Sequence, residues 1–458
     1  DVVKKLARKA NAKVHFVEHH IAHAASTFFG SEFNKANIVT IDGRGELSSA
    51  IIAVGNDTEI EKLHEIPLPH SVGFLYSAVT QFLGFRPNNG EYKVMGLSSY
   101  GKDAYRSIFD KIIWTTEDGF ATNPDYYWGH IASWENTAEQ VFYTNKFVKA
   151  FGNPLQKYQN PFTNKHEHIA ATMQLKTQEV GSHLVDLAYE KTGYGDLCLA
   201  GGVALNSKMN GKLAIKENVK NIYIIAAAHD VGTSLGAAYF VYNQLTGKRP
   251  EPFRHVYYGP EFSDDEIKKY LDKCKLRYEY SSDIPARVAE LLANQKIVGW
   301  FQGRMEVAPR ALGNRSILAN PVHPDTKDLV NKCVKNREWW RPFALTILDE
   351  VKKDYLVHNL DSPFMILVDE VFDEKKQEIA AGIHVDGTTR PQTLRKEINP
   401  KYYHLIKHLG DQTGTYAVLN TSFNLAGEPI VCTPEEAVKD FFASGMDYLA
   451  IGNYLVKK

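Results

Sequence analysis

Hydrophobic residues in the first half of the chain gather in short runs that end in glycine turns. The run from Asn37 to Ile41 is apolar and β-branched, and the turn after it contains Gly43 and Gly45. A second apolar run follows at residues 48–55. This pattern predicts a β-hairpin whose glycine turn lets the backbone approach a ligand.

Two more buried strands are expected at residues 197–200 and 222–228. The first leads into Gly201-Gly202 and then Asn206, which can cap a helix. The second leads into residues 229–232 and then a helix rich in small side chains. Ligands at such junctions lie at the carboxyl edge of the strands and at a helix N-terminus. A structural turn explains any one junction, but the three together favour a nucleotide or phosphate site.

A break in the pattern between Leu245 and Ser263 predicts a domain boundary. Two prolines and a Gly-Pro pair interrupt regular structure there. The acidic residues that follow Ser263 predict the first turn of a new helix with Ser263 as its N-cap. Because 458 residues exceed what one core usually serves, we expect two or three domains, with mixed strands and helices that indicate an α/β fold.

Composition excludes several classes of protein. Acidic residues number 54 and basic residues 53, so the formal charge of -1 argues against a dedicated nucleic-acid binder. Apolar runs stay shorter than the roughly 18–20 residues that span a bilayer, so no membrane partner is expected. The 4 cysteines are far apart, which favours reduced thiols and a cytoplasmic location. Since the chain begins at Asp1, we expect that residues upstream are missing.

Candidate metal ligands begin with His19 and His23, which are spaced i and i+4 and share one face of a helix. This spacing is common for two ligands of a transition metal. Asp42 and Asp230 follow apolar strands and would complete a set suited to iron, manganese or zinc. On spacing alone, a helix with one buried and two exposed histidines is the simpler interpretation, since the chain has 17 histidines.

Fixed cations are dense in the C-terminal half, where they alternate with bulky apolar residues. Arginine in such surroundings is costly unless it is paired or awaits an anion, and its guanidinium binds phosphate bidentately. Asn420 follows another apolar strand and could donate an amide hydrogen bond. An internal ion-pair network is the competing interpretation, although few acids lie nearby in sequence (Glu306 and Glu338). The cations are Arg304, Arg310, Arg315, Lys335, Arg337, Arg341 and Arg390.

Several motifs together resemble the carbamoyltransferases of the nodulation and antibiotic-tailoring type. They run in that family's order over almost the whole chain, and their combination is specific although each one alone is weak. The motifs are HHIAHAAS, IDGRGE, GEYKVMGLSSYGK, GGVALNSKMNGKL, HDVGTSLGAA, VAPRALGNRSIL, VKNREWWRPFA, TRPQT and LNTSFNLAGEPIV.

The resemblance implies a two-domain α/β architecture. Residues 1–252 would form an actin-like ATPase (Kae1-like) domain for carbamoyl transfer, similar to the tRNA threonylcarbamoyl transferase. Residues 253–458 would form a YrdC-like domain, similar to the enzyme that makes threonylcarbamoyl adenylate. The family begins with a further hairpin that the chain lacks, so we expect the first domain to be N-terminally incomplete in a truncated or processed chain.

The resemblance also implies a reaction and its site residues. Carbamoyl phosphate and ATP, with Mg²⁺ as an option, would give carbamoyl adenylate in the C-terminal domain. The residues matched to carbamoyl phosphate are Arg310, Lys335, Arg341, Arg390 and Asn420. Those assigned to nucleotide or cofactor binding are Gly201, Gly202, Asn206, Arg304 and Arg315. The metal, usually Fe(II), would be held by His19, His23, Asp42 and Asp230.

The acceptor is expected to be a hydroxyl of a small molecule such as a sugar or secondary metabolite. His20 and His229 are candidates for the base that deprotonates it. The aromatic segment from Tyr105 to Phe162 is our candidate for the acceptor pocket, although most of its aromatics would equally form a satellite core. Two alternatives stay open, a tRNA-directed carbamoyl-type transferase and a non-catalytic protein that binds nucleotide. A homodimer is also left open.

Overall fold

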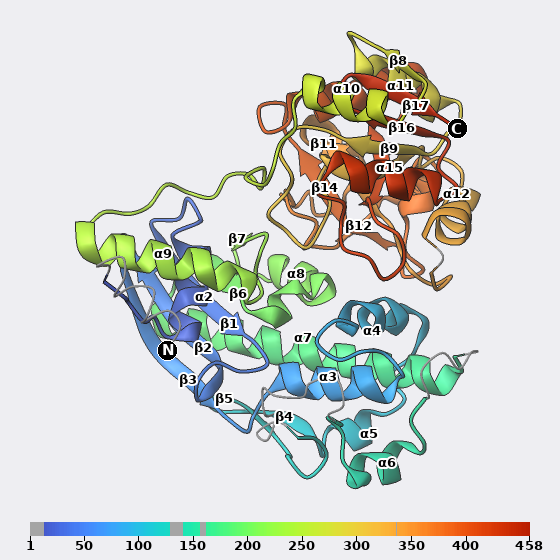
Figure 1. The fold of residues 1–458 in the computed structure, drawn as a ribbon. Coiled ribbons are helices and arrows are strands. Elements are labelled where there is room, and N and C mark those ends of the chain that lie inside the picture. The colour runs from blue at the N-terminus through green and yellow to red at the C-terminus, as the bar shows by residue number, and fades with distance from the viewer. Residues whose placement is uncertain (1–12, 129–140, 156–161, 336) are drawn as a thin grey trace.

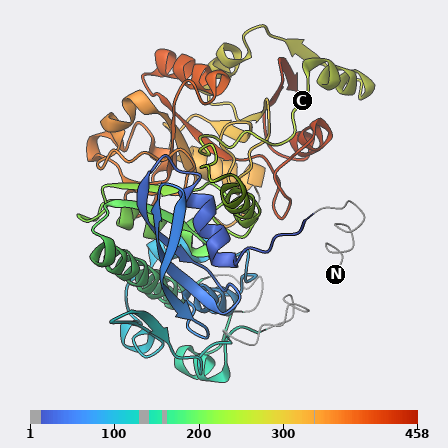
Figure 2. The same ribbon diagram turned by 90° about the vertical axis from the view of Figure 1, so that its left-hand side faces the viewer.

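The computed structural model describes residues 13–128, 141–155, 162–335 and 337–458. The chain forms two units, each built around its own β-sheet, and the units lie one above the other in both views (Figures 1 and 2). All 4 cysteines are free thiols. Within the described ranges, no helix is both long enough and apolar enough to cross a membrane.

The first unit contains a five-stranded mixed sheet in the order β3-β2-β1-β6-β7. The predicted hairpin is present, because β1 and β2 pair antiparallel with Ile41 opposite Ala50. β6 and β7 continue the sheet parallel to β1. The strands are β1 (Lys35–Ile41), β2 (Ser48–Asn56), β3 (Glu59–Pro67), β6 (Asp196–Ala200) and β7 (Asn221–Ile224), with a separate small hairpin of β4 (Ile113–Thr116) and β5 (Gly119–Thr122).

Helices cover both faces of this sheet (Figure 1). β1 is buried on both faces, since Ile38 packs with residues of α2 while Val39 packs with residues of α7. α2 and α9 approach closely because Gly236 of α9 faces the carbonyl oxygen of Ala22, where a Cβ would lie only 1.8 Å away. The helices are α2 (His19–Phe28), α3 (Val72–Phe82), α4 (Glu91–Leu97), α5 (Arg106–Phe109), α6 (Asn145–Phe151), α7 (Asn164–Thr192), α8 (Ser207–Ala214) and α9 (Val231–Thr246), with the 3₁₀ turns η1 (Ser98–Tyr100) and η2 (Gly202–Leu205).

The second unit contains an eight-stranded mixed sheet in the order β14-β11-β15-β10-β9-β16-β17-β8. Its central strands are fully buried, as expected for a sheet that is covered on both faces. The strands are β8 (Tyr278–Tyr280), β9 (Val298–Phe301), β10 (Arg315–Ala319), β11 (Ala344–Leu348), β14 (Pro391–Leu394), β15 (Ala417–Ser422), β16 (Tyr448–Ile451) and β17 (Tyr454–Lys457), with β12 (Asp369–Glu370) and β13 (Thr388–Thr389) paired separately.

The helices of the second unit lie in two layers. α11 and α14 pack on one face of the sheet, and α10 and α15 belong to the core on the other face. α10 begins with the predicted N-cap, where Ser263 and Glu266 form a reciprocal capping box. The helices are α10 (Asp264–Lys273), α11 (Ile284–Ala293), α12 (Asp325–Leu329), α13 (Lys352–Tyr355), α14 (Pro400–Thr413) and α15 (Pro434–Phe442), with η3 (Val330–Lys335), η4 (Asp349–Val351), η5 (Asp373–Lys375) and η6 (Ala380–Gly382) as shorter turns.

The strand predicted at residues 222–228 is shorter in the structure. β7 ends at Ile224, where its partner strand β6 also reaches the end of their pairing. Residues 225–228 stay buried but leave the sheet, and the carbonyl of Ala228 accepts a hydrogen bond from Gly201 N at 2.8 Å. The apolar run therefore correctly predicted buried residues, but the strand predicted from it is too long.

An apolar contact joins the two units. Trp340 of the second unit packs against Phe162 and Phe85 of the first, with ring centroids 4.7 and 6.4 Å apart. Phe364 packs against Tyr223 and Phe253 on the other side of the contact. Figure 1 shows α4 and α8 on the side of the first unit that faces the second. This contact fixes how the site residues of the two units face each other.

Candidate functional site

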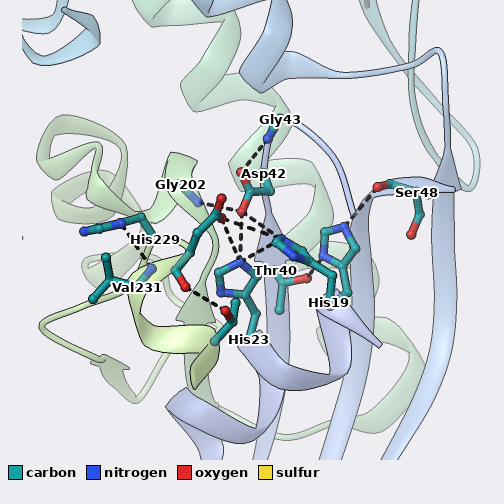
Figure 3. Close-up of polar contacts among 12 residues, drawn as sticks. His19, His23, Thr40, Asp42, Gly43, Ser48, Gly202, His229 and Val231 are labelled. Carbon is teal, nitrogen blue, oxygen red and sulfur yellow. Dashed lines mark hydrogen bonds and ion pairs between the residues drawn. The ribbon is translucent and has the colours of Figure 1, made fainter. Parts of the chain in front are cut away.

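Two histidines and two aspartates converge at the carboxyl ends of strands in the first unit. α2 carries His19 and His23 one turn apart, Asp42 directly follows β1, and Asp230 caps α9. Each of the four side chains offers one nitrogen or oxygen atom, and these four atoms all lie within 4.8 Å of one another. Figure 3 shows His19, His23 and Asp42 pointing toward one another. The fold therefore brings together the four ligands expected from the sequence.

The donor set fits a transition-metal ion. His23 Nε2 lies 2.9 Å from Asp42 Oδ2 and 3.1 Å from His19 Nε2, and Asp230 Oδ1 lies 3.6 and 3.7 Å from the two histidine nitrogens. Neighbouring ligands that each lie about 2.1 Å from one ion are separated by roughly 3 Å. Two imidazoles and two carboxylates match the preferences of iron, manganese or zinc.

Hydrogen bonds from the backbone hold Asp42 in place. Gly43 N donates to its Oδ1 at 2.6 Å, and Gly202 N donates to its Oδ2 at 3.1 Å (Figure 3). Burial raises the pKa of Asp42, but hydrogen bonds from His19 and His23 outweigh it and hold the pKa well below its usual range. Burial likewise opposes protonation of His23, yet its bonds to Asp230 and Asp42 raise the pKa to about 9.

The two candidates for a base lie in different environments. His20 is fully buried and bonds to Thr40 Oγ1 at 2.7 Å and to the carbonyl of Ser48 at 3.1 Å, and burial lowers its pKa to about 4. Both ring nitrogens of His20 are thereby occupied inside the core. His229 lines the large cavity that extends from the His/Asp cluster to the second unit. Burial also lowers the pKa of His229. Of the two, only His229 can meet a ligand in the cavity.

The glycine junction after β6 sits directly beside the aspartate. Gly201 has φ +95° and lies against the carbonyl of Ile41, where a Cβ would be 2.2 Å away, so no other residue fits. Asn206 caps α8 by accepting from Met209 N, and its side chain also exchanges two hydrogen bonds with Gln174 at 2.9 Å. Asn206 therefore shapes the junction with groups that are already hydrogen-bonded.

A cavity of about 1350 Å³ extends from this cluster to the second unit. Asp42, Gly202, His229 and Asp230 line one part of it. The rest is lined by most of the predicted anion-binding residues, namely Arg310, Lys335, Arg337, Arg341, Arg390 and Asn420. The volume exceeds the range of roughly 300–1,000 Å³ that is typical of small-molecule sites. One cavity therefore joins two regions. We call the part next to His19, His23, Asp42 and Asp230 the His/Asp end, and the part lined by the cations and Asn420 the arginine end.

Like charges crowd the arginine end. Burial, and next the charge of Arg341, lowers the pKa of Arg310 to about 10 and that of Arg337 to about 9. Burial, and next the charge of Arg310, lowers the pKa of Arg390 well below its usual range. The Nε atoms of Arg310 and Arg390 are buried with no hydrogen-bond partner in the described ranges. This arrangement favours a bound anion.

Hydrogen bonds to neighbouring residues hold Lys335 and Asn420 in place. Lys335 Nζ donates to the carbonyls of Ser422 and Asn424 at 2.8 Å each. Burial, and next the charge of Arg337, lowers the pKa of Lys335 well below its usual range. The amide nitrogen of Asn420 donates to Thr346 Oγ1 at 3.1 Å, while its buried Oδ1 has no partner among the described residues. Asn420 thus lines the cavity while its amide nitrogen donates within the protein, and its role toward a ligand stays a prediction.

Arg304 and Arg315 lie outside the cavity. Arg304 is exposed and donates to the carbonyls of Tyr258 and Gly259. Arg315 is fully buried, donates to the carbonyls of Gln302, Gly303, Asn314 and Pro260, and stacks on Phe301 with its guanidinium carbon 3.8 Å from the ring centroid. These bonds give both arginines a role in holding loops together, and their assignment to cofactor binding stays a prediction.

The segment proposed for the acceptor is only partly described, since residues 129–140 and 156–161 lie outside the described ranges. Of the rest, Phe142 reaches the cavity, while Tyr127, Phe147 and Phe151 are buried in the first core. Sequence reasoning missed other lining residues, of which Tyr92, Lys93 and Lys208 matter below. The signal was present, because Tyr92 and Lys93 fall in the motif GEYKVMGLSSYGK, to which no role was given.

Comparison with known proteins places both halves of the chain in one family. A model described as "Carbamoyltransferase N-terminus" matches residues 2–239, and one described as "Carbamoyltransferase C-terminus" matches residues 289–458. The nodulation protein NolO of Bradyrhizobium diazoefficiens is 36% identical over 96% of this chain and 79% of its own length.

A more distant relative and a solved structure extend the comparison. The 3'-hydroxymethylcephem-O-carbamoyltransferase of Amycolatopsis lactamdurans is 29% identical over 61% of this chain and 52% of its own length. The crystal structure of HypF from T. kodakarensis aligns with a TM-score of 0.29 and 16% identity, over 54% of this chain and 39% of that chain. The resemblance inferred from the motifs is confirmed by the family models and the relatives. This chain belongs to the carbamoyltransferase family of enzymes.

Proposed function

We propose that this chain is an ATP-dependent O-carbamoyltransferase that activates carbamoyl phosphate at the arginine end of its cavity and transfers the carbamoyl group at the His/Asp end. The observation that carries this proposal is one cavity of about 1350 Å³ that is lined by Asp42 and Asp230 of the His/Asp cluster and by the arginines. The acceptor would be a hydroxyl of a small molecule, as the name of the 3'-hydroxymethylcephem-O-carbamoyltransferase indicates for that relative.

The activation step needs cations for a physical reason. Nitrogen donation stabilises the carbonyl of a carbamate, which makes it a poor donor until it is joined to a good leaving group. In the proposed step, water releases inorganic phosphate from carbamoyl phosphate, and a carbamate oxygen then attacks the α-phosphorus of ATP. Pyrophosphate leaves, and carbamoyl adenylate remains. The crowded guanidiniums would neutralise the phosphate charges that otherwise repel one another.

The roles at the arginine end follow from the surroundings of each residue. Arg310 and Arg390 present guanidiniums with unsatisfied Nε atoms, so we assign them to the phosphate groups. Lys335 is fixed by two carbonyls and supplies a further positive charge. The free Oδ1 of Asn420 suits the NH₂ group of carbamate, which is a donor.

The transfer step would take place at the His/Asp end. His19, His23, Asp42 and Asp230 would hold the metal, for which we propose iron, and when bound it would supply a Lewis acid. Gly201, Gly202 and Asn206 would form the floor for the nucleotide. His229 lies in the same part of the cavity and is our candidate for the base that takes the proton from the acceptor hydroxyl.

The domain assignment is part of the proposal. We assign residues 1–252 to an actin-like, Kae1-like transfer domain and residues 253–458 to a YrdC-like activation domain. A mixed sheet with helices on both faces and ligands at its carboxyl edge supports the first assignment. The second is supported by an arginine-lined cavity on a separate mixed sheet.

Pyrophosphate exchange tests the proposal. Wild-type protein should incorporate labelled pyrophosphate into ATP only when carbamoyl phosphate is present. Arg341→Ala should lower this exchange by about 100-fold, because a charged hydrogen bond to phosphate is lost. Arg277→Ala, an exposed arginine of the same unit that does not line the cavity, is the matched control. Binding of ATP and carbamoyl phosphate without exchange would favour the non-catalytic alternative, and unchanged exchange in Arg341→Ala would overturn the assignment of the pocket.

A further inference from the structure

Arg341 of the arginine end is positioned by groups on both units. Its guanidinium carbon lies 4.4 Å from the centroid of the Tyr92 ring, which belongs to α4 of the first unit. Its NH1 group also lies 3.3 Å from Glu338 Oε2. A guanidinium between an aromatic ring and a carboxylate has few rotamers left, so its direction into the cavity is fixed before a ligand arrives.

Glu338 itself is held by the first unit. Its other oxygen, Oε1, accepts a hydrogen bond from Lys93 Nζ at 2.7 Å. Both side chains are largely covered, at 27% exposed for Lys93 and 23% for Glu338. Burial raises the pKa of Glu338, but the hydrogen bond from Lys93, together with a backbone hydrogen bond and the charges of Lys93 and Arg341, lowers the pKa below the usual value. The carboxylate is therefore charged and tied to α4 by one of its two oxygens.

The hydrogen bond between Lys93 and Glu338 affects how Arg341 can bind an anion. Of Lys335 and the four arginines at this end, Arg341 alone forms an ion pair within the described ranges. A free carboxylate could chelate Arg341 with both oxygens and would then compete with a phosphate for the same guanidinium. Because Lys93 occupies one oxygen, Glu338 orients Arg341 through a single long contact and leaves its remaining donors to the ligand.

The turn that follows α4 makes further contacts with the second unit. Tyr100 packs edge-on against Trp339 with ring centroids 5.2 Å apart. Lys208 on α8 bridges Ser99 and Asp386 at 2.9 and 3.0 Å, which ties the end of α4 to the second unit again. The motif GEYKVMGLSSYGK thus contributes contacts from the first unit to the arginine end.

We propose that Tyr92 and Lys93 are positioning residues for the donor, so that the first unit completes the anion pocket of the second. Tyr92 stacks on Arg341, and Lys93 prevents Glu338 from competing with the donor phosphate. The inference rests on the proposed function, because it names residues that prepare the same pocket. An ordinary exposed ion pair is worth little, but this pair acts on the direction of a ligand-binding arginine.

Steady-state exchange kinetics of the full chain test the proposal. Lys93→Met should raise the KM for carbamoyl phosphate about tenfold, with kcat within about twofold and the KM for ATP unchanged. Lys93→Arg should restore the wild-type KM, because it keeps the charge. Tyr92→Leu should raise the same KM, whereas Tyr92→Phe, which keeps the ring, should not.

A double-mutant cycle separates positioning from a structural role. In a Glu338→Gln background there is no carboxylate to restrain, so adding Lys93→Met should change the KM for carbamoyl phosphate less than about twofold. Lys146→Met is the control, since Lys146 also pairs with a carboxylate, that of Asp125 at 2.8 Å, lies over the ring of Tyr126 and does not line the cavity. An unchanged KM in Lys93→Met, or an equal effect of that change in both backgrounds, would overturn the proposal.

A binding measurement keeps this proposal apart from the proposed function. If wild-type protein shows no exchange that depends on carbamoyl phosphate, the proposed function fails. Calorimetric titration with inorganic phosphate then decides the positioning role by itself. Weaker phosphate binding by Lys93→Met than by wild type, with Lys146→Met unchanged, supports the proposal, and equal binding by all three overturns it.

Discussion

The two ends of the cavity handle charge in opposite ways. At the His/Asp end, imidazoles lie 2.9–3.7 Å from carboxylates, so positive and negative groups satisfy one another. At the arginine end, Arg310, Arg337 and Arg390 form no ion pair with a carboxylate in the described ranges, and their pKa values are lowered by burial and next by the charges of neighbouring arginines.

This difference indicates different ligands. A cluster that combines imidazoles with carboxylates offers both nitrogen and oxygen ligands to a cation. It is stable before the cation arrives, because its groups hydrogen-bond to one another. A cluster of like charges is unfavourable until an anion enters, so the protein gives up stability to hold it. The arginine end therefore suits activation of a phosphorylated donor, and the His/Asp end suits transfer assisted by a metal.

The largest expected effect separates the two ends. Asp42→Asn keeps the shape of the side chain but removes a charge from the metal set, so carbamoyl transfer to glycerol as a model alcohol should fall more than about 1,000-fold. Pyrophosphate exchange should stay within about threefold of wild type, because it depends on the other end. Product mass spectrometry and the exchange assay on the same preparation measure both. An equal loss of both activities would break the proposed division.

The next prediction uses the cost of like charges. Arg390→Met should lower pyrophosphate exchange about 100-fold and at the same time raise the free energy of unfolding by about 1 kcal/mol, because a crowded cation is replaced by an apolar side chain. Urea denaturation gives the stability, with Arg277→Met as the control at an exposed site. A loss of several kcal/mol would contradict the account in which Arg390 is a crowded cation without a partner.

A smaller effect is expected from phosphate alone. Inorganic phosphate should relieve the repulsion at the arginine end and raise the Tm by about 3 °C near saturation. The rise should disappear in Arg390→Met and persist in Asp42→Asn. Differential scanning fluorimetry over a phosphate series, at constant ionic strength, makes this measurement. A rise that is the same in both variants would place the anion elsewhere.

These ends could be predicted from sequence to different degrees. The His19/His23 spacing and the aspartates after apolar strands were sufficient to find the His/Asp end, because each signal is local. The arginine end was found as a set, but Arg315 could not be told from Arg310 by sequence. Both lie in the motif VAPRALGNRSIL, and only the fold shows that Arg315 donates to backbone carbonyls while Arg310 lines the cavity.

The fold was predictable at the level of elements and less so at the level of contacts. The hairpin of β1 and β2 and the capping box at Ser263 are encoded by neighbouring residues. The contact between Lys93 and Glu338 joins residues 245 positions apart, and neither residue carries a pattern that specifies its partner. Long-range pairing across the two units therefore had to come from the structure.

The smallest expected effect concerns the link between the ends. Burial raises the pKa of Asp386, but the charge of Lys208 and a hydrogen bond from Thr388 lower it overall, well below its ordinary 3.8. A depressed carboxyl pKa stabilises the folded state above pH 3.8, and this stability is lost as the pH falls below that value. Asp386→Asn should thus cost about 0.5–1 kcal/mol at pH 7 and a smaller amount near pH 2 in urea denaturation, because the carboxyl is partly protonated there in the unfolded chain. An equal cost at both pH values would contradict the charge-based account.

A mixing experiment tests most directly whether one cavity serves both steps within one chain. Asp42→Asn retains the arginine end, and Arg390→Met retains the His/Asp end. If carbamoyl adenylate passes through the cavity of a single molecule, an equimolar mixture of the two variants should transfer carbamoyl to glycerol no faster than the sum of the variants alone. Recovery of transfer toward the wild-type rate would show that the intermediate leaves one chain and enters another, which would contradict the shared cavity as the route.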